Sequence, residues 1–171
     1  MNSSHTNTML RDHDSAHRDS VPGRAARLLA WGPARMKSPS ARWAVNVLAV
    51  AGAALMVWSG VIHLQLWSDG YRSISVIGPL FLIQGVGGIA LAALIAVFRR
   101  VVLMAAGAVM MAATAAGLLL SAGIGLFGFT ESLAVPYAMS SLVVEFAGAA
   151  VLAAATALVL AARPGSHPVQ R

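Results

Sequence analysis

Residues 43–67, WAVNVLAVAGAALMVWSGVIHLQLW, form a long run without a formal charge. Working outward from it, comparable runs occupy residues 74–98, 101–127 and 137–162, and Glu145 is the one formally charged residue within the four. The hydrocarbon core of a bilayer is about 30 Å thick, which a helix crosses with roughly 20 apolar residues. The four runs therefore predict four membrane-spanning segments.

The backbone decides the conformation of these segments. Lipid offers no hydrogen-bond partner, so a spanning segment must be a helix or part of a closed barrel. Barrel strands would be near 10 residues long with alternating polarity, whereas these runs are longer and apolar throughout. We predict an all-α integral membrane protein, a four-helix up-down bundle, because short connections make consecutive helices antiparallel.

The composition excludes an ordinary water-soluble domain. The chain of 171 residues is 58% hydrophobic and 11% charged, whereas soluble domains are about 45–50% apolar and about 25% charged. The formal net charge is +6, but its basic residues flank the apolar runs instead of covering a folded surface. We therefore expect the lipid bilayer as a partner and no nucleic acid.

The positions of the basic residues predict the orientation. Of the 12 Lys and Arg residues, all but Arg72 lie in residues 1–42, at residues 99–100 or in residues 163–171. Lys and Arg are enriched in the cytoplasmic segments of membrane proteins. This pattern predicts a plasma-membrane protein with both termini in the cytoplasm.

The two ends of the chain are expected to be tails. Residues 1–42 are rich in Ser, Asp, His, Arg and Pro, so we expect a disordered, basic cytoplasmic tail. They contain no apolar core of the kind that a cleavable signal peptide needs. Residues 163–171 are expected to be a short cytoplasmic C-terminal tail.

Small residues spaced four apart let transmembrane helices approach closely. Each run carries one such stripe, which we expect to face the other helices. The stripes are Gly52, Met56 and Gly60; Gln84, Gly88 and Ala92; Gly117, Ser121 and Gly125; and Ser141, Glu145, Ala149, Ala153 and Ala157.

Polar residues concentrate toward the outer side of the membrane. At a rise of 1.5 Å per residue, His63 lies near the outer end of the first run, Gln84 about three turns into the second and Glu145 about two turns into the fourth. The inner halves of the runs contain few polar residues. This distribution predicts an outward-facing pocket for a ligand or a proton at His63, Gln84 and Glu145.

Two interpretations of Glu145 stay open. A charged carboxylate at mid-membrane costs about 2.5–3.5 kcal/mol on insertion scales, so intramembrane acids are usually functional. Glu145 is then a proton-responsive or ligand-binding group. Alternatively, it makes a structural hydrogen bond to Gln84 or Ser121 between helices. His63 is the single histidine of the four runs, which favours an interfacial side chain bonded to backbone or to Glu145 over a haem or metal ligand.

Tyr71, Arg72 and Glu131 lie in the expected outer connections. Tyr71 and Arg72 fit an aromatic belt with a snorkelling cation. In the functional alternative, Arg72 pairs with Glu131 across the two connections and closes a vestibule over Glu145.

Several kinds of site are absent from the sequence. The chain has no cysteine, which excludes disulfides, thiolate metal sites and cysteine nucleophiles. The glycine-rich piece at 85–90, GVGGIA, follows no strand and is not a phosphate-binding loop. No nucleophile–base pair stands out, so we expect no enzyme, no metal and no cofactor.

Two longer stretches carry a resemblance. These are HLQLWSDGYRSISVIGPLFL at 63–82 and GLFGFTESLAVPYAMSSLVVE at 125–145. Over about residues 43–162 the chain resembles small four-span membrane proteins of high-GC Gram-positive bacteria, and it is loosely similar to DoxX-type four-helix proteins. The resemblance implies the four-helix membrane fold and brings no activity and no functional residue with it.

Three functional hypotheses follow for such a bundle. The first is a membrane protein with a small outward-facing pocket. The second is an accessory or structural subunit whose Ala and Gly stripes dock on a larger membrane protein complex. The third is a small proton-coupled carrier using Glu145, which would need a homodimer because four spans enclose little volume.

Overall fold

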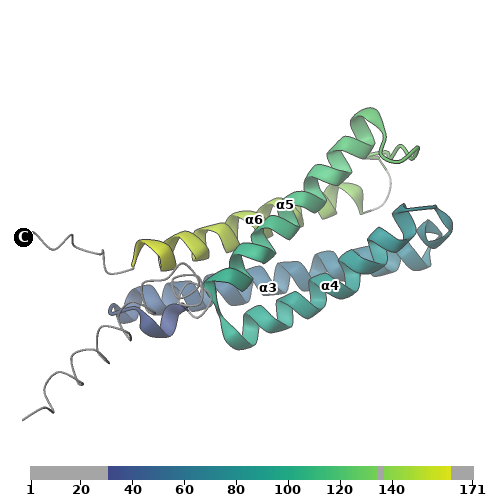
Figure 1. Cartoon of the computed structure of the whole chain (residues 1–171). Coiled ribbons are helices and arrows are strands. Elements are labelled where there is room, and N and C mark those ends of the chain that lie inside the picture. Colours follow the sequence, from purple (N-terminus) through teal and green to yellow (C-terminus); the bar gives the residue numbers. More distant parts are fainter. Residues whose placement is uncertain (1–30, 135–136, 163–171) are drawn as a thin grey trace, which may run out of the picture.

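The computed structural model describes residues 31–134 and 137–162, and within them it is an all-α protein with four long apolar helices and no strand (Figure 1). The helices are α3 (Pro39–Ser68), α4 (Ile77–Phe98), α5 (Val101–Ile124) and α6 (Ala138–Ala161). Two 3-10 turns, η1 (Pro33–Arg35) and η2 (Tyr71–Ser73), lie before α3 and after it. The prediction of four long helices is confirmed.

Local sequence signals explain where the helices begin and end. The Ser38 side chain accepts a hydrogen bond from the backbone N–H of Ala41, and Pro39 occupies the first turn, so α3 begins four residues before the apolar run. Helix α4 ends at Phe98, and the C-cap residue Arg99 adopts a left-handed conformation. Helix α5 stops three residues before the predicted end because Gly125 turns the chain at a φ of 81°.

The four helices do not pack equally. Helix α3 lies along both α4 and α6, and α5 lies along α6, whereas α4 and α5 make few contacts with each other. Figure 1 shows α4 and α5 diverging from the short link at Arg99–Arg100. This divergence leaves space between α4 and α5 at the end of the bundle that carries η2 and the loop 125–134.

Glycines allow the closest approach between helices. A Cβ atom on Gly60 of α3 would lie 2.9 Å from the carbonyl oxygen of Gly85 on α4, so neither helix could keep its position. Gly148 of α6 similarly accommodates the Met111 side chain of α5. Small residues therefore determine the spacing of the helices at these two interfaces.

The expected packing stripes are only partly right. On α6 the buried positions continue from Ser141 and Glu145 to Gly148, Leu152, Ala155 and Val159, while Ala153 and Ala157 are exposed. On α5 the buried residues are Val101, Met104, Gly107, Met111, Ala115 and Ser121, of which only Ser121 belongs to the expected stripe, and Gly117 has open space beside it. Each residue turns a helix by about 100°, so a strict spacing of four drifts by about 40° per step and leaves the buried face.

Residues 31–42 differ from the expected disordered tail, whose residues 1–30 lie outside the described residues. Met36 is buried in the core, and the carbonyl oxygen of Trp31 accepts a hydrogen bond from the backbone N–H of Val101 at 3.0 Å. Gly32 lies so close to the Arg99 carbonyl that a Cβ there would be 2.9 Å from its oxygen. This segment therefore packs on the link between α4 and α5. The expected tail at residues 163–171 is also outside the described part of the chain.

Candidate functional site

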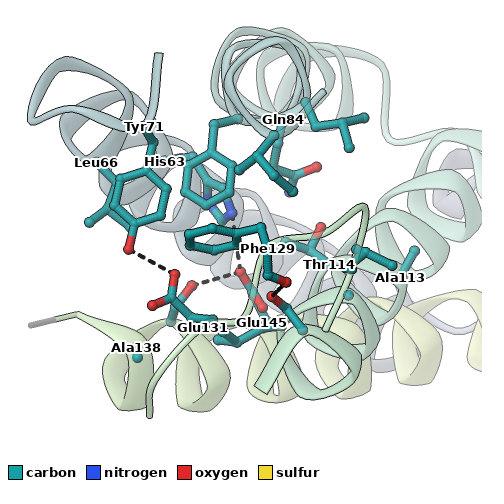
Figure 2. Close-up of a pocket in the computed structure, with 18 of the residues that line it drawn as sticks. His63, Leu66, Tyr71, Gln84, Ala113, Thr114, Phe129, Glu131, Ala138 and Glu145 are labelled. Carbon is teal, nitrogen blue, oxygen red and sulfur yellow. Dashed lines mark hydrogen bonds and ion pairs between the residues drawn. The ribbon is translucent and has the colours of Figure 1, made fainter. Parts of the chain in front are cut away.

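A cavity of about 350 Å³ lies where α4 and α5 diverge (Figure 2). Helices α3 and α6 contribute His63 and Glu145 to its lining, and the loop 125–134 contributes Phe129 and Glu131. Most of the other lining residues belong to α4 and α5, and the lining as a whole is largely apolar. The cavity brings His63, Gln84 and Glu145, which lie on three different helices, to one space.

Glu145 is the most deeply buried charged residue of the cavity, with no exposed surface. Its Oε1 accepts hydrogen bonds from the hydroxyls of Ser141, at 2.8 Å, and Ser59, at 3.2 Å. Ser141 lies one turn earlier on α6, on the same helix face, and Ser59 lies on α3. These two hydroxyls hold the carboxyl group between α3 and α6.

The second carboxyl oxygen of Glu145, Oε2, is buried without a hydrogen-bond partner. Buried polar atoms almost always have a partner, so such an atom calls for an explanation. Glu145 is one of the residues that line the cavity, so a small rotation of its carboxyl group would bring this oxygen to a molecule bound there. Oε2 is therefore the strongest chemical indication of a ligand in this site.

His63 stands next to the same carboxyl group. Its Nδ1 donates to the carbonyl oxygen of Ser59 at 2.8 Å, since that oxygen can only accept. Its Nε2 lies 3.9 Å from Glu145 Oε1, which is too long for a hydrogen bond. The backbone contact orients the ring and leaves Nε2 facing the carboxyl group.

Three aromatic rings form one wall of the cavity, at the end of the bundle that carries η2 and the loop 125–134. Tyr71 stacks on Phe81 with ring centroids 4.9 Å apart and meets the edge of Phe129 at 5.7 Å. The hydroxyl of Tyr71 donates to Glu131 Oε2 at 2.7 Å. Partial burial, together with this hydrogen bond and the nearby negative charge, raises the pKa of Tyr71 to about 12. Tyr71 thus remains a neutral donor to Glu131.

The loop that carries Phe129 and Glu131 is tied to the end of α5. Leu126 and Phe129 exchange two backbone hydrogen bonds, and the Ser121 hydroxyl donates to the Phe129 carbonyl at 3.3 Å. Glu131 also accepts from the backbone N–H of Ser132. These contacts position the ring of Phe129 and the carboxyl group of Glu131 at the cavity.

The remaining predicted site residues lie in different places. Gln84 is partly exposed and lines the cavity from α4. Arg72 is exposed and is not part of the lining. In the described part of the chain, Glu131 bonds to Tyr71, and the ion pair with Arg72 that the functional alternative required is not formed.

Sequence reasoning missed the partners of Glu145. It proposed Gln84 or Ser121, whereas Ser59 and Ser141 make the hydrogen bonds. A spacing signal was present, since Ser141 is four residues before Glu145 and Ser59 is four residues before His63. Phe81 and Phe129 carried no comparable signal, because their role depends on how the helix and loop pack.

Comparison of the chain with family models, curated proteins and solved structures finds no match. The chemistry of the site therefore follows from its own geometry. In residues 31–134 and 137–162, no group of three His, Asp or Glu side chains is placed to hold a metal ion. What the site does combine is an apolar cavity, two carboxyl groups and three aromatic rings.

Proposed function

We propose that the chain is a multi-pass protein of the plasma membrane, with α3 to α6 crossing the bilayer in up-down order and both termini in the cytoplasm. The helices contain 22 to 30 residues and are about 33–45 Å long at 1.5 Å per residue, enough for the hydrocarbon core. Large apolar side chains cover their outer faces, such as Val109, Val143 and Ile83, each 64–69% exposed. In water such a surface would aggregate, whereas lipid solvates it.

In this orientation the cavity lies in the outer half of the bundle, and we propose that it binds a small lipophilic cation. The observation that carries this proposal is the unpartnered Oε2 of Glu145, a residue that lines a largely apolar cavity. A positively charged group there would give the carboxylate its missing partner. The apolar walls would bind the remainder of the ligand.

The other groups at the cavity favour a cation over an anion. Glu131 adds a second carboxyl group, and no Lys or Arg of the described chain lines the cavity. The rings of Tyr71, Phe81 and Phe129 line the cavity, and a cation over the face of such a ring gains about 0.5–2 kcal/mol. A volume of about 350 Å³ suits a small molecule and lies near the low end for ligand pockets.

A binding measurement with a charged probe and an uncharged probe of the same shape tests this proposal. Benzyltrimethylammonium has a permanent positive charge, and neopentylbenzene has the same shape with carbon in place of nitrogen. We expect isothermal titration of the detergent-solubilised protein to show binding of the ammonium compound at least tenfold tighter than that of the hydrocarbon. Equal affinity for the two probes would overturn the assignment of a cation site.

The matched variants are Glu145→Gln and Asp69→Asn. Both remove one carboxylate at the same end of the molecule, but only Glu145 lines the cavity. Benzyltrimethylammonium has no N–H group, so the Glu145 carboxylate attracts it by charge alone. An ion pair at about 4 Å gains about 4 kcal/mol at an effective dielectric constant of about 20, part of which desolvation offsets, so Glu145→Gln should weaken ammonium binding at least tenfold. Asp69→Asn should leave it unchanged, and an equal loss in both variants would refute the site.

A further inference from the structure

A second pocket, of about 590 Å³, lies at the opposite end of the molecule. It is formed by η1, the first turns of α3 and the link between α4 and α5. Four arginines line it, Arg35, Arg42, Arg99 and Arg100. In the sequence, all four are among the basic residues that predict the orientation, and the tertiary structure gathers them around one hollow.

Among the residues that the structure describes, the charged side chains that line this pocket are all basic. The carboxylates of the described residues, Asp69, Glu131 and Glu145, all lie toward the other end of the helices. The guanidinium Nε of Arg99 is buried without a hydrogen-bond acceptor. Arg35 is held over the ring of Trp31 at 5.8 Å from its centroid. The arrangement therefore offers donors to an anion.

The rim of this pocket is apolar and exposed. Trp43, Val97 and Phe98 line it, and they are 71%, 68% and 56% exposed. Trp and Phe side chains at helix ends are typical of the boundary between headgroups and acyl chains. A ligand that fills both the arginine-lined hollow and this apolar rim would carry an anionic group next to a hydrocarbon chain.

We propose that this pocket binds the phosphate headgroup of an anionic phospholipid from the cytoplasmic leaflet. The arginines receive the phosphate oxygens, which their planar, multi-donor guanidinium groups suit. The acyl chains lie along Trp43, Val97 and Phe98. This inference rests on the proposed membrane crossing and is independent of the cation cavity.

Native mass spectrometry of the full chain in detergent, with phosphatidylglycerol or phosphatidylcholine added, tests the proposal. We expect phosphatidylglycerol to bind one high-affinity site at least tenfold more tightly than phosphatidylcholine. Each of Arg42→Gln and Arg99→Gln should weaken phosphatidylglycerol binding about fivefold, equivalent to about 1 kcal/mol per basic group near an anionic lipid. Arg72→Gln, which removes an exposed arginine outside this pocket, is the matched control and should bind like the wild type.

The outcomes separate lipid from free anion and from a general charge effect. If inorganic phosphate at millimolar concentration displaces phosphatidylglycerol, the pocket is a site for soluble anions and the lipid assignment fails. If Arg72→Gln loses as much affinity as Arg42→Gln, binding follows net charge and the pocket is refuted. Ammonium binding at the α4–α5 cavity should be unchanged in Arg42→Gln and Arg99→Gln, so this proposal and the proposed cation site fail separately.

Discussion

His63 Nε2 lies 3.9 Å from Glu145 Oε1, while Nδ1 of the same ring donates to the carbonyl of Ser59. The histidine is thus fixed by its own helix and faces the carboxyl group of another. Together with Oε2, which has no partner, the pair forms a polar group between α3 and α6 at the wall of an apolar cavity.

The affinity of the cavity for a cation should fall as the pH is lowered. A proton on Glu145 competes with the cation for the carboxylate, and a proton on His63 adds a repelling positive charge. Tyr71 and Glu131 are the other titratable groups at the cavity. Titration of benzyltrimethylammonium between pH 8 and pH 5 should show this decrease. His63→Gln should reduce the pH dependence, and a dependence identical to the wild type would mean that His63 plays no part in it.

Filling the cavity should block ligand binding without unfolding the protein. Gly117 lines the cavity, and a Cβ there would meet nothing within 4 Å, so Gly117→Leu should be accommodated. Gly123, also on α5 and equally open, lies outside the cavity and provides the control Gly123→Leu. Isothermal titration should show loss of ammonium binding in Gly117→Leu alone. Retained binding there would place the ligand elsewhere.

The contact between α3 and α4 should be sensitive to one added methyl group. Gly60→Ala would place its Cβ 2.9 Å from the Gly85 carbonyl oxygen, and overpacking of this kind costs about 1–3 kcal/mol. Gly87→Ala adds the same group 3.7 Å from the nearest atom and should be neutral or stabilising by up to about 1 kcal/mol, since Ala favours helix over Gly. Thermal unfolding in detergent should rank Gly60→Ala below the wild type and Gly87→Ala at or above it.

The raised pKa of Tyr71 gives a pH dependence of stability with a definite sign. The phenol keeps its proton up to about pH 12 in the folded protein, whereas an unfolded tyrosine loses it near about pH 10. The contribution of Tyr71 to the free energy of unfolding is therefore complete below about pH 10 and is lost as the pH rises toward about 12. Ultraviolet titration should show a late ionisation that is absent in Tyr71→Phe. In Glu131→Gln it should move to lower pH, and an unchanged position would show that Glu131 has no effect on Tyr71.

The proposed orientation can be tested by thiol labelling because the chain contains no cysteine. Lys37 and Ser132 are both exposed, at opposite ends of the helices. In intact cells, a membrane-impermeant maleimide should label Ser132→Cys. Lys37→Cys should be labelled only after lysis. Labelling of both from the same side would refute the up-down crossing.

The helices themselves were predictable because their causes are local. Uninterrupted apolar runs must satisfy their backbone hydrogen bonds internally, and signals such as Ser38, Pro39 and Gly125 mark ends that lie within a few residues of the predicted ones. The concentration of His63, Gln84 and Glu145 at one depth also follows from spacing along each helix. These inferences need only the order of residues and the rise per residue.

The tertiary structure decided which side chains meet. Helix rotation and tilt depend on the fit between neighbours, as at Gly60 against Gly85. A spacing of four residues in the sequence does not determine how each helix is rotated about its axis. The divergence of α4 from α5 creates the cavity. At η2, the hydroxyl of Tyr71, and not the guanidinium of Arg72, bonds to the carboxyl group of Glu131. Composition and periodicity therefore establish four apolar helices, because those are properties of single segments. The cavity and the arginine pocket depend on contacts between segments far apart in the chain, which only three-dimensional packing determines.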